Sequence, residues 1–126
     1  MLKHIALEAN DRREADIFFT EILGLKKTNS LTISAGLNKA VFGIEKEMAV
    51  ENFEREGLRL EVFITGRKKI DLSCDHVCIE VENKEEFIKK CEKHDIKTNI
   101  VKKEGKDLLF ARDFSGNLFE IKEKRG

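Results

Sequence analysis

The chain has 126 residues, and its 24 basic and 24 acidic side chains leave it formally neutral at pH 7. This length predicts a single domain, residues 1–126, with one substantial core. The charge balance disfavours binding to nucleic acid or to a membrane surface, because both select proteins with a basic excess. The sequence has no secretory signal at its start and no apolar run of the roughly 18–20 residues that a membrane-spanning helix needs. We therefore expect a cytoplasmic protein.

The first half of the chain predicts a strand followed by a helix. Apolar and polar side chains alternate over Leu2–Ala9, as in a strand with two different faces. Asn10 or Asp11 can cap the helix that follows, and Gly24 suits the end of that helix. The buried stripe of the helix is predicted to consist of Ala15, Phe18, Phe19, Ile22 and Leu23.

Three shorter strands are expected next, around Leu31–Ala35, Ala40–Ile44 and Leu58–Ile64. The charged stretch Glu45–Glu56 between the last two is expected to be a loop or a short helix. In the third of these strands the leucines, valine and isoleucine share one face, so Glu61 points to the other face.

The segment Gly66–Lys69 is predicted to be a solvated linker, after which the second half repeats the order of the first. A strand with Val77, Ile79 and Val81 on its apolar face is followed by a helix that Asn83 can cap. The buried stripe of this helix is predicted to consist of Phe87, Ile88 and Cys91, and strands are expected over residues 97–102, 106–112 and 118–122.

The two halves carry the same short phrases. Each opens on a histidine phrase, and each later presents Gly-x-x-x-Glu; these stretches are Lys3–Glu8, Asp75–Glu80, Gly57–Glu61 and Gly116–Glu120. Strand alternation puts His4, Glu61, His76 and Glu120 on sheet faces turned away from the helices. Taken singly, a strand histidine is more often structural and a glutamate more often a surface charge. Together they indicate a metal site with two imidazole and two carboxylate ligands where the copies meet.

At this level the sequence resembles the vicinal-oxygen-chelate superfamily, which includes glyoxalase I, bleomycin-resistance proteins and extradiol dioxygenases. Three stretches carry the resemblance: Ile17–Leu25, Cys74–Val81 and Asp113–Ile121. It implies an α+β fold of two βαβββ modules, residues 1–66 and 73–126, that form a curled mixed sheet around a cleft. It also implies a homodimer, in which the cleft is built by modules of one chain or of two.

The resemblance further implies a glyoxalase-like lyase or isomerase that acts on a small-molecule substrate. Its ligands to nickel, zinc, cobalt or manganese would be His4, Glu61, His76 and Glu120. The metal would stabilise an enediolate of an α-hydroxycarbonyl or thioester-type compound, with Glu120 as the base and Glu61 as the second candidate. A metal-bound water is a further candidate base.

Departures from the family pattern concern the substrate. Bacterial glyoxalase I resembles this chain but has an arginine at the place of Glu8 and an asparagine at the place of Thr65, so the standard glutathione adduct is not the expected substrate. Glu8 and its counterpart Glu80 are open to three interpretations. They could orient the histidines, select the substrate, or be neutralised by a cation such as Arg59, Arg112 or Lys122. In the stretch Asp113–Ile121, Phe114 and Ser115 replace the proline and aspartate that are usual in the family.

Other classes of function stay open. An iron-dependent extradiol-type dioxygenase would use the same cleft, whereas a metal-free drug- or metabolite-binding protein would line it with apolar groups. Cys74, His76 and Cys78 share a face and could in principle hold zinc, although clustered Cys-x-x-Cys pairs are absent. We expect the three cysteines, Cys74, Cys78 and Cys91, to be free buried thiols in a reducing compartment. The abundance of lysine and glutamate, with no glutamine, resembles proteins of hot-growing organisms.

Overall fold

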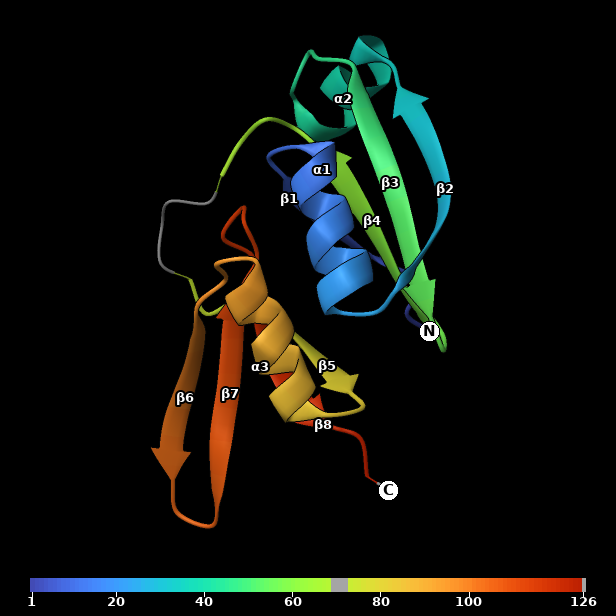
Figure 1. Cartoon of the computed structure of the whole chain (residues 1–126). Helices are drawn as coiled ribbons and strands as arrows, with labels where there is room; N and C mark the ends of the chain where they lie inside the picture. The colour runs from blue at the N-terminus through green and yellow to red at the C-terminus, as the bar shows by residue number, and fades with distance from the viewer. Residues whose placement is uncertain (69–72, 126) are drawn as a thin grey trace.

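The computed structural model describes residues 1–68 and 73–125, so Lys69 of the predicted linker and Gly126 lie outside the described residues. The first module contains β1 (Ile5–Ala9), α1 (Arg12–Asp16), the π-helical segment η1 (Ile17–Ile22), β2 (Lys26–Ile33), α2 (Ala35–Phe42), β3 (Met48–Arg55) and β4 (Leu58–Ile64). The second contains β5 (Val77–Val81), α3 (Lys84–Lys93), β6 (Thr98–Lys103), β7 (Lys106–Arg112) and β8 (Leu118–Glu123). Figure 1 shows the modules as two bodies, each with its helix laid on its sheet.

The two modules repeat one strand topology. Each forms a four-stranded mixed sheet, in the orders β1-β4-β3-β2 and β5-β8-β7-β6. The first strand pairs in parallel with the last, and the remaining neighbours are antiparallel. The predicted α+β class and the pair of modules are therefore confirmed. No helix in the described ranges is long and apolar enough to cross a membrane.

The predicted helix starts are also confirmed. The Asp11 carboxylate accepts a hydrogen bond of 2.7 Å from the Glu14 amide, and the Asn83 side chain accepts one of 2.9 Å from Glu86. Both bonds satisfy an amide that would otherwise lack a partner at the start of a helix. Gly24 adopts a φ of 76°, a left-handed conformation that glycine tolerates without strain.

Two predictions for the first module are wrong. The expected strand Ala40–Ile44 lies mostly in helix α2, whose start is capped by the Ser34 hydroxyl. The buried Asn38 amide fixes this helix by donating to the carbonyls of Ile33 and Lys46. The expected loop or short helix Glu45–Glu56 is largely strand β3. The strand expected around Leu31–Ala35 is present as β2, which starts earlier, at Lys26.

One hydrophobic core joins the helix-covered faces of both sheets. Phe18 of η1 lies 5.1 Å from Phe119 of β8, centroid to centroid, and Phe19 lies 5.2 Å from Phe53 of β3. The predicted stripes of both helices contribute buried residues to this core. The core that each copy cannot build alone is thus completed by the other copy.

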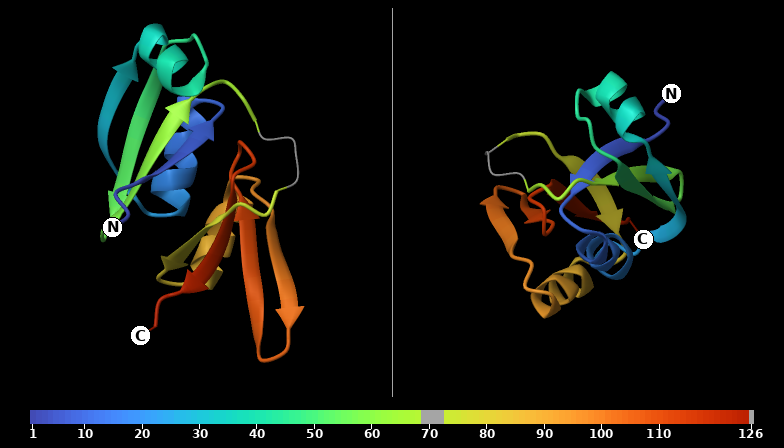
Figure 2. Two further views of the ribbon diagram at one scale, coloured as in Figure 1. Left: turned by 180° about the vertical axis from the view of Figure 1, so that it is seen from behind. Right: turned by 90° about the horizontal axis from the view of Figure 1, so that it is seen from above.

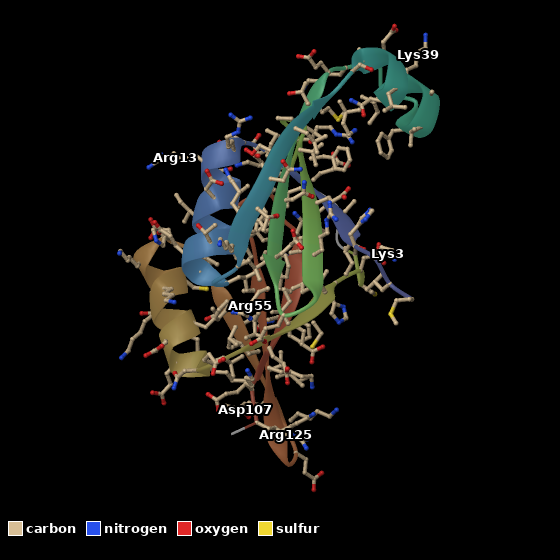
Figure 3. The ribbon with its side chains drawn as sticks, turned by 90° about the vertical axis from the view of Figure 1, so that its right-hand side faces the viewer. Lys3, Arg13, Lys39, Arg55, Asp107 and Arg125 are labelled. Atoms are coloured by element: carbon tan, nitrogen blue, oxygen red, sulfur yellow. The ribbon has the colours of Figure 1, made fainter. Side chains whose placement is uncertain are left out.

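Polar contacts tie the modules together at both ends of this core. Asn117, before β8, donates to the Glu8 carbonyl at 2.8 Å, and the Ser115 hydroxyl accepts from the Asn10 amide at 2.7 Å. Arg55, labelled in Figure 3, donates to the carbonyls of Leu23 and Glu80. Ser115 is one of the residues that depart from the family pattern, and this contact gives it a role in joining the modules.

A buried acid in β3 explains why that strand escaped the sequence analysis. The Glu51 side chain is 1% exposed, and Arg12 and Lys27 approach it at 2.5 and 3.4 Å. Burial alone would raise the pKa of Glu51. A hydrogen bond from the Ser30 hydroxyl and the charges of Lys27 and Arg12 outweigh burial and lower the pKa below its ordinary value. The carboxylate is therefore ionised in the folded protein, and its partners come from distant segments.

The substitution Glu51→Gln should lower the free energy of unfolding at neutral pH by about 1–3 kcal/mol, because it removes charge-assisted bonds from a buried site. The lowered pKa means that this stabilisation is complete above the unfolded-state value of 4.5 and is lost as the pH falls through the folded-state value. Urea denaturation at neutral pH and at about pH 3 should show the difference from wild type shrinking in acid. Glu45→Gln, in an exposed ion pair with Lys39, is the control; an equal effect there would contradict the prediction.

Candidate functional site

The first module brings the predicted pair His4 and Glu61 together. His4 directly precedes β1, and Glu61 lies in β4 opposite Ala6. The His4 Nε2 atom is 3.5 Å from one carboxylate oxygen of Glu61, and the Arg59 guanidinium is 3.5 Å from the other. The flanking Leu60 and Val62 are completely buried, whereas the Glu61 side chain is 21% exposed. Glu61 therefore lies on the outer face, as strand alternation predicted.

The second module repeats this arrangement. The His76 Nε2 atom is 3.4 Å from one carboxylate oxygen of Glu120, and Lys122 Nζ is 3.8 Å from the other. Phe119 and Ile121 on either side of Glu120 are buried in the core, and the Glu120 side chain is 18% exposed. Each copy thus presents an imidazole, an acid and a cation on the outer face of its sheet.

The hydrogen bond made by the other ring nitrogen of His76 fixes its chemistry. His76 Nδ1 lies 2.8 Å from the Cys74 carbonyl oxygen, which can only accept, so Nδ1 carries a proton. In the neutral imidazole the lone pair is then on Nε2, which faces the Glu120 carboxylate. Two electron-rich atoms face each other there, and a proton or a metal ion between them would relieve the repulsion. A histidine that ligates a metal commonly donates its second nitrogen in this way.

A single chain does not gather the four residues into one cluster. Among residues 1–68 and 73–125, no group of three or more His, Cys, Asp and Glu side chains is arranged to hold a metal ion. The reason is the shared core, which engages the helix-covered faces of both sheets. The left view of Figure 2, seen from behind, shows the strands in front of α1 and α3. The two His–Glu pairs consequently lie on separate outer faces.

The chemistry of the donors fits a divalent metal ion. Each pair offers one imidazole nitrogen and one carboxylate oxygen, and two such pairs form a mixed set suited to nickel, cobalt, zinc or manganese. The His76 tautomer places a lone pair on the atom that would bind. His4 and Glu61 of one chain with His76 and Glu120 of a second chain would supply four ligands.

Asn52 is a polar residue of the same outer face that the sequence analysis missed. It lies directly opposite Glu61 in the β3–β4 pairing, its side chain is buried, and both of its amide atoms lack a partner among the described residues. The corresponding place in the second module, opposite Glu120, is occupied by Phe110. The module fold therefore does not require an amide there. Asn52 was missed because the segment Glu45–Glu56 was expected to be a loop or a short helix, in which strand alternation does not apply.

Glu8 is neutralised by a cation that the sequence did not suggest. Arg67, from the predicted linker, contacts one Glu8 oxygen through Nη2 at 2.7 Å and Nε at 2.9 Å. Arg59 and Lys122 instead contact Glu61 and Glu120, and Arg112 donates to the Gly116 carbonyl. The place where bacterial glyoxalase I carries an arginine therefore holds an internal ion pair.

The cysteines have the properties of free thiols. None of the three forms a disulfide, and Cys91 is buried as predicted. The predicted burial is wrong for Cys74 and Cys78, which are exposed. Burial raises the pKa of the Cys91 thiol to about 12. Burial, and next the Glu120 charge, raise the pKa of Cys78 as well. Cys74, His76 and Cys78 do not form a group placed to hold a metal ion within the described residues, which disfavours the Cys74–His76–Cys78 zinc site.

Comparison with solved structures identifies the fold. A glyoxalase family protein from Enterococcus faecalis is 22% identical over 96% of this chain and 95% of that chain, with a TM-score of 0.70. The fosfomycin resistance protein FosX from Listeria monocytogenes is 15% identical over 99% and 93%, with a TM-score of 0.74. The trypanothione-dependent glyoxalase I from Leishmania major is 20% identical over 98% and 86%, with a TM-score of 0.71. No family model matches the sequence, and no curated protein does.

These matches, to glyoxalase and fosfomycin-resistance proteins, confirm the fold that the resemblance implied. The chain has the glyoxalase-like architecture along nearly its whole length. At such low identity the likeness defines the arrangement of strands and helices, while the chemistry has to be argued from the residues.

The buried amide of Asn52 gives a test of whether its position serves stability. Asn52→Leu should raise the free energy of unfolding by about 1–2 kcal/mol, because a buried amide without a partner costs energy on this order. The matched control is Asn117→Leu, since the buried Asn117 amide donates to Glu8 and Asp113 and its loss should destabilise. Urea denaturation of both variants measures the effects. A destabilised Asn52→Leu protein would contradict the prediction.

Proposed function

We propose that the protein is a metal-dependent lyase or isomerase of the glyoxalase type, acting on a small α-hydroxycarbonyl or thioester-type compound. The observation that carries this proposal is the repeated His–Glu pair, with imidazole Nε2 and carboxylate oxygen 3.4–3.5 Å apart in both modules. Such pairs, each on the outer face of its own sheet, are half-sites. We propose that two copies of the chain form a homodimer in which each site combines both modules.

Glu120 is the proposed base. A bound divalent metal would supply Lewis-acid stabilisation to the two neighbouring substrate oxygens. The Glu120 carboxylate would remove the proton from the carbon next to the carbonyl and return it to the adjacent carbon. Both acids have an imidazole and a cation beside them: Glu120 at 3.4 and 3.8 Å, and Glu61 at 3.5 Å from each. Glu61, with His4 and Arg59 on its two oxygens, would mainly hold the site together.

The ion pair at Glu8 supports a substrate other than the glutathione adduct. A glutathione carboxylate needs an unpaired cation to receive it. Arg67 is engaged by Glu8 on this face through two contacts to the same oxygen. The face therefore offers an anionic carboxylate neither the arginine nor the asparagine that the bacterial enzyme provides at these places.

A subunit-mixing experiment tests whether the site is shared. His4→Ala and His76→Ala proteins should each bind nickel far more weakly than wild type, because each loses one ligand from every site. In a dimer of one subunit of each kind, one site loses both histidines and the other keeps both. Unfolding and refolding an equal mixture should therefore restore about one quarter of the wild-type metal content. Elemental analysis after removal of free metal measures it.

The two single variants, refolded separately, are the control for this mixing. A mixture that binds no more metal than the separate variants would contradict a shared site. Full metal occupancy in the His76→Ala protein alone would contradict the ligand assignment itself.

Proton exchange tests the reaction class. Nickel-loaded protein in heavy water should incorporate deuterium next to the carbonyl of a small α-hydroxyketone such as hydroxyacetone, as followed by NMR. Glu120→Gln should slow this exchange by a factor of about 100 or more, because the general base is lost. Metal content of the variant is the control, because a drop in metal alone would also slow exchange. A fully metal-loaded Glu120→Gln protein with wild-type exchange would contradict the assigned role.

The comparisons support a second candidate function, resistance to fosfomycin. FosX structures match this fold as well as glyoxalases do, and one of them is complexed with Mn(II) and sulfate. Arg59 and Lys122 are cations on the outer faces, each beside an acid, and a phosphonate would have to displace that acid to reach them. Loss of fosfomycin from a manganese-loaded sample, without deuterium exchange into the ketone, would favour this activity. Turnover of catechol by the iron-loaded protein would favour the dioxygenase alternative.

A further inference from the structure

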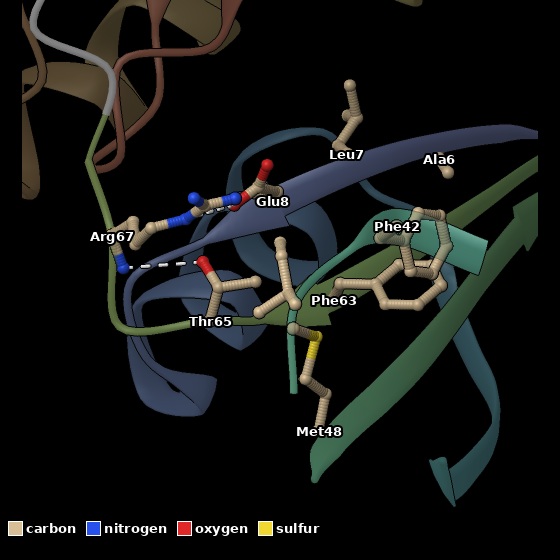
Figure 4. A pocket seen from close by; sticks show the side chains of 9 residues that line it. Ala6, Leu7, Glu8, Phe42, Met48, Phe63, Thr65 and Arg67 are labelled. Atoms are coloured by element: carbon tan, nitrogen blue, oxygen red, sulfur yellow. Dashed lines mark hydrogen bonds and ion pairs between the residues drawn. The ribbon is translucent and has the colours of Figure 1, made fainter. Parts of the chain in front are cut away.

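A pocket of about 190 Å³ lies between α2 and the outer face of the first sheet. Figure 4 shows the rings of Phe42 and Phe63 side by side at one end, with Met48 next to them, and Arg67 with Glu8 and Thr65 at the other. The two phenylalanine rings meet edge to face, 5.4 Å apart. Apart from the ion pair and the threonine, the lining is apolar.

Helix α2 makes this pocket a property of the first module alone. In the second module β6 ends at Lys103 and β7 begins at Lys106, so a tight turn replaces the helix. The duplicated fold therefore does not need α2. Its residues Leu37, Val41 and Phe42 are all exposed, and Phe42, which is 51% exposed, turns its ring to Phe63 over the sheet.

The pocket lies beside the His4–Glu61 pair. Ala6, which lines it, is the register partner of Glu61. Phe63 lies two residues beyond Glu61 on the same strand face, a separation of about 7 Å along a strand. A compound whose oxygens lie at the His4–Glu61 pair could therefore place its substituent in the pocket.

The size and charge of the pocket define the substituent that it fits. An apolar cavity of about 150 Å³ is enough to bind benzene in another protein, so this pocket has room for a phenyl-sized group. Glu8 and Arg67 neutralise each other, so the pocket offers no unpaired charge to a charged substituent. We propose that it is a binding site for a neutral hydrocarbon group of phenyl size. As part of the substrate, that group rests on the proposed function; as a ligand site, the pocket stands by itself.

Methionine NMR tests the pocket without any catalysis. The chain has two methionines, Met1 and Met48, and Met48 is buried in the pocket lining while Met1 is fully exposed. In protein with labelled methionine methyl groups, benzyl alcohol should shift the Met48 signal and leave Met1 unchanged. Benzoate and benzylamine, of the same size but charged, should bind at least tenfold more weakly. Equal binding of all three probes, or no shift of Met48, would overturn the proposal.

Variants from both walls identify the site. Ala6→Leu fills the pocket from the exposed side of β1, and Phe42→Ala removes the wall that α2 provides. Each should weaken benzyl alcohol binding at least tenfold. Val41→Ala, at the position before Phe42 in α2 and outside the pocket lining, should keep the affinity for benzyl alcohol within twofold of wild type. Circular dichroism of each variant verifies the fold. A folded Ala6→Leu protein with wild-type affinity would overturn the proposal even if Phe42→Ala failed to fold.

A comparison of two α-hydroxy acids connects the pocket to the metal. In nickel-loaded protein, mandelate should bind at least tenfold more tightly than lactate, because only mandelate carries a phenyl group, and Ala6→Leu should remove the difference. If nickel does not bind but benzyl alcohol does, the proposed enzyme fails while the pocket stands, as in a metal-free binding protein. If nickel binds but mandelate has no advantage over lactate, the pocket is not part of the substrate site and that half of the proposal is overturned.

Discussion

The alternation of side chains along β4 and β8 is the constraint on which the core and the candidate site both depend. Leu60, Val62 and Phe119 are completely buried, while Glu61 and Glu120 between such residues reach the outer face. A slip of one residue in either strand would put a carboxylate into the core and an apolar side chain outside. The apolar neighbours, which drive folding, therefore also fix the direction of each acid. Stability and ligand placement are set by the same register.

The shared core separates folding from assembly of the site. Phe18 packing on Phe119 brings the two modules of one chain together through their helix-covered faces, and the outer faces are left without a counterpart in that chain. A four-ligand site built from these faces needs a second copy, so its metal affinity would depend on protein concentration even though the fold does not. The hydrogen bonds of Ser115 and Asn117 hold the two modules of one chain together, with one His–Glu pair on the outer face of each.

The second module was predictable from the sequence because its determinants are local. Its strands alternate regularly, and the Asn83 cap lies three residues before the amide that it accepts from. Strand β3 was not predictable, since Glu51 resembles a surface charge until Arg12 and Lys27 arrive from elsewhere in the fold. Helix α2 was missed for a similar reason, because Asn38 holds it through carbonyls on both sides. In the candidate site, strand alternation correctly predicted the outer sheet face for Glu61 and Glu120. The His76 tautomer and the partner of Glu8 were not predictable, because they depend on how the chain folds back.

The two modules of the chain agree where the metal would bind and differ where a substrate would lie. Both keep an imidazole beside an acid and a cation beside the acid's other oxygen. Beside the acids, however, the first module has Asn52 where the second has Phe110, and α2 covers only the first sheet. A site made of the first module of one chain and the second module of another chain would therefore be symmetric in its ligands and asymmetric in its walls. Such asymmetry gives a bound molecule a direction: its vicinal oxygens can be held by equivalent groups, while its substituent distinguishes the apolar pocket beside Glu61 from the face that carries Glu120.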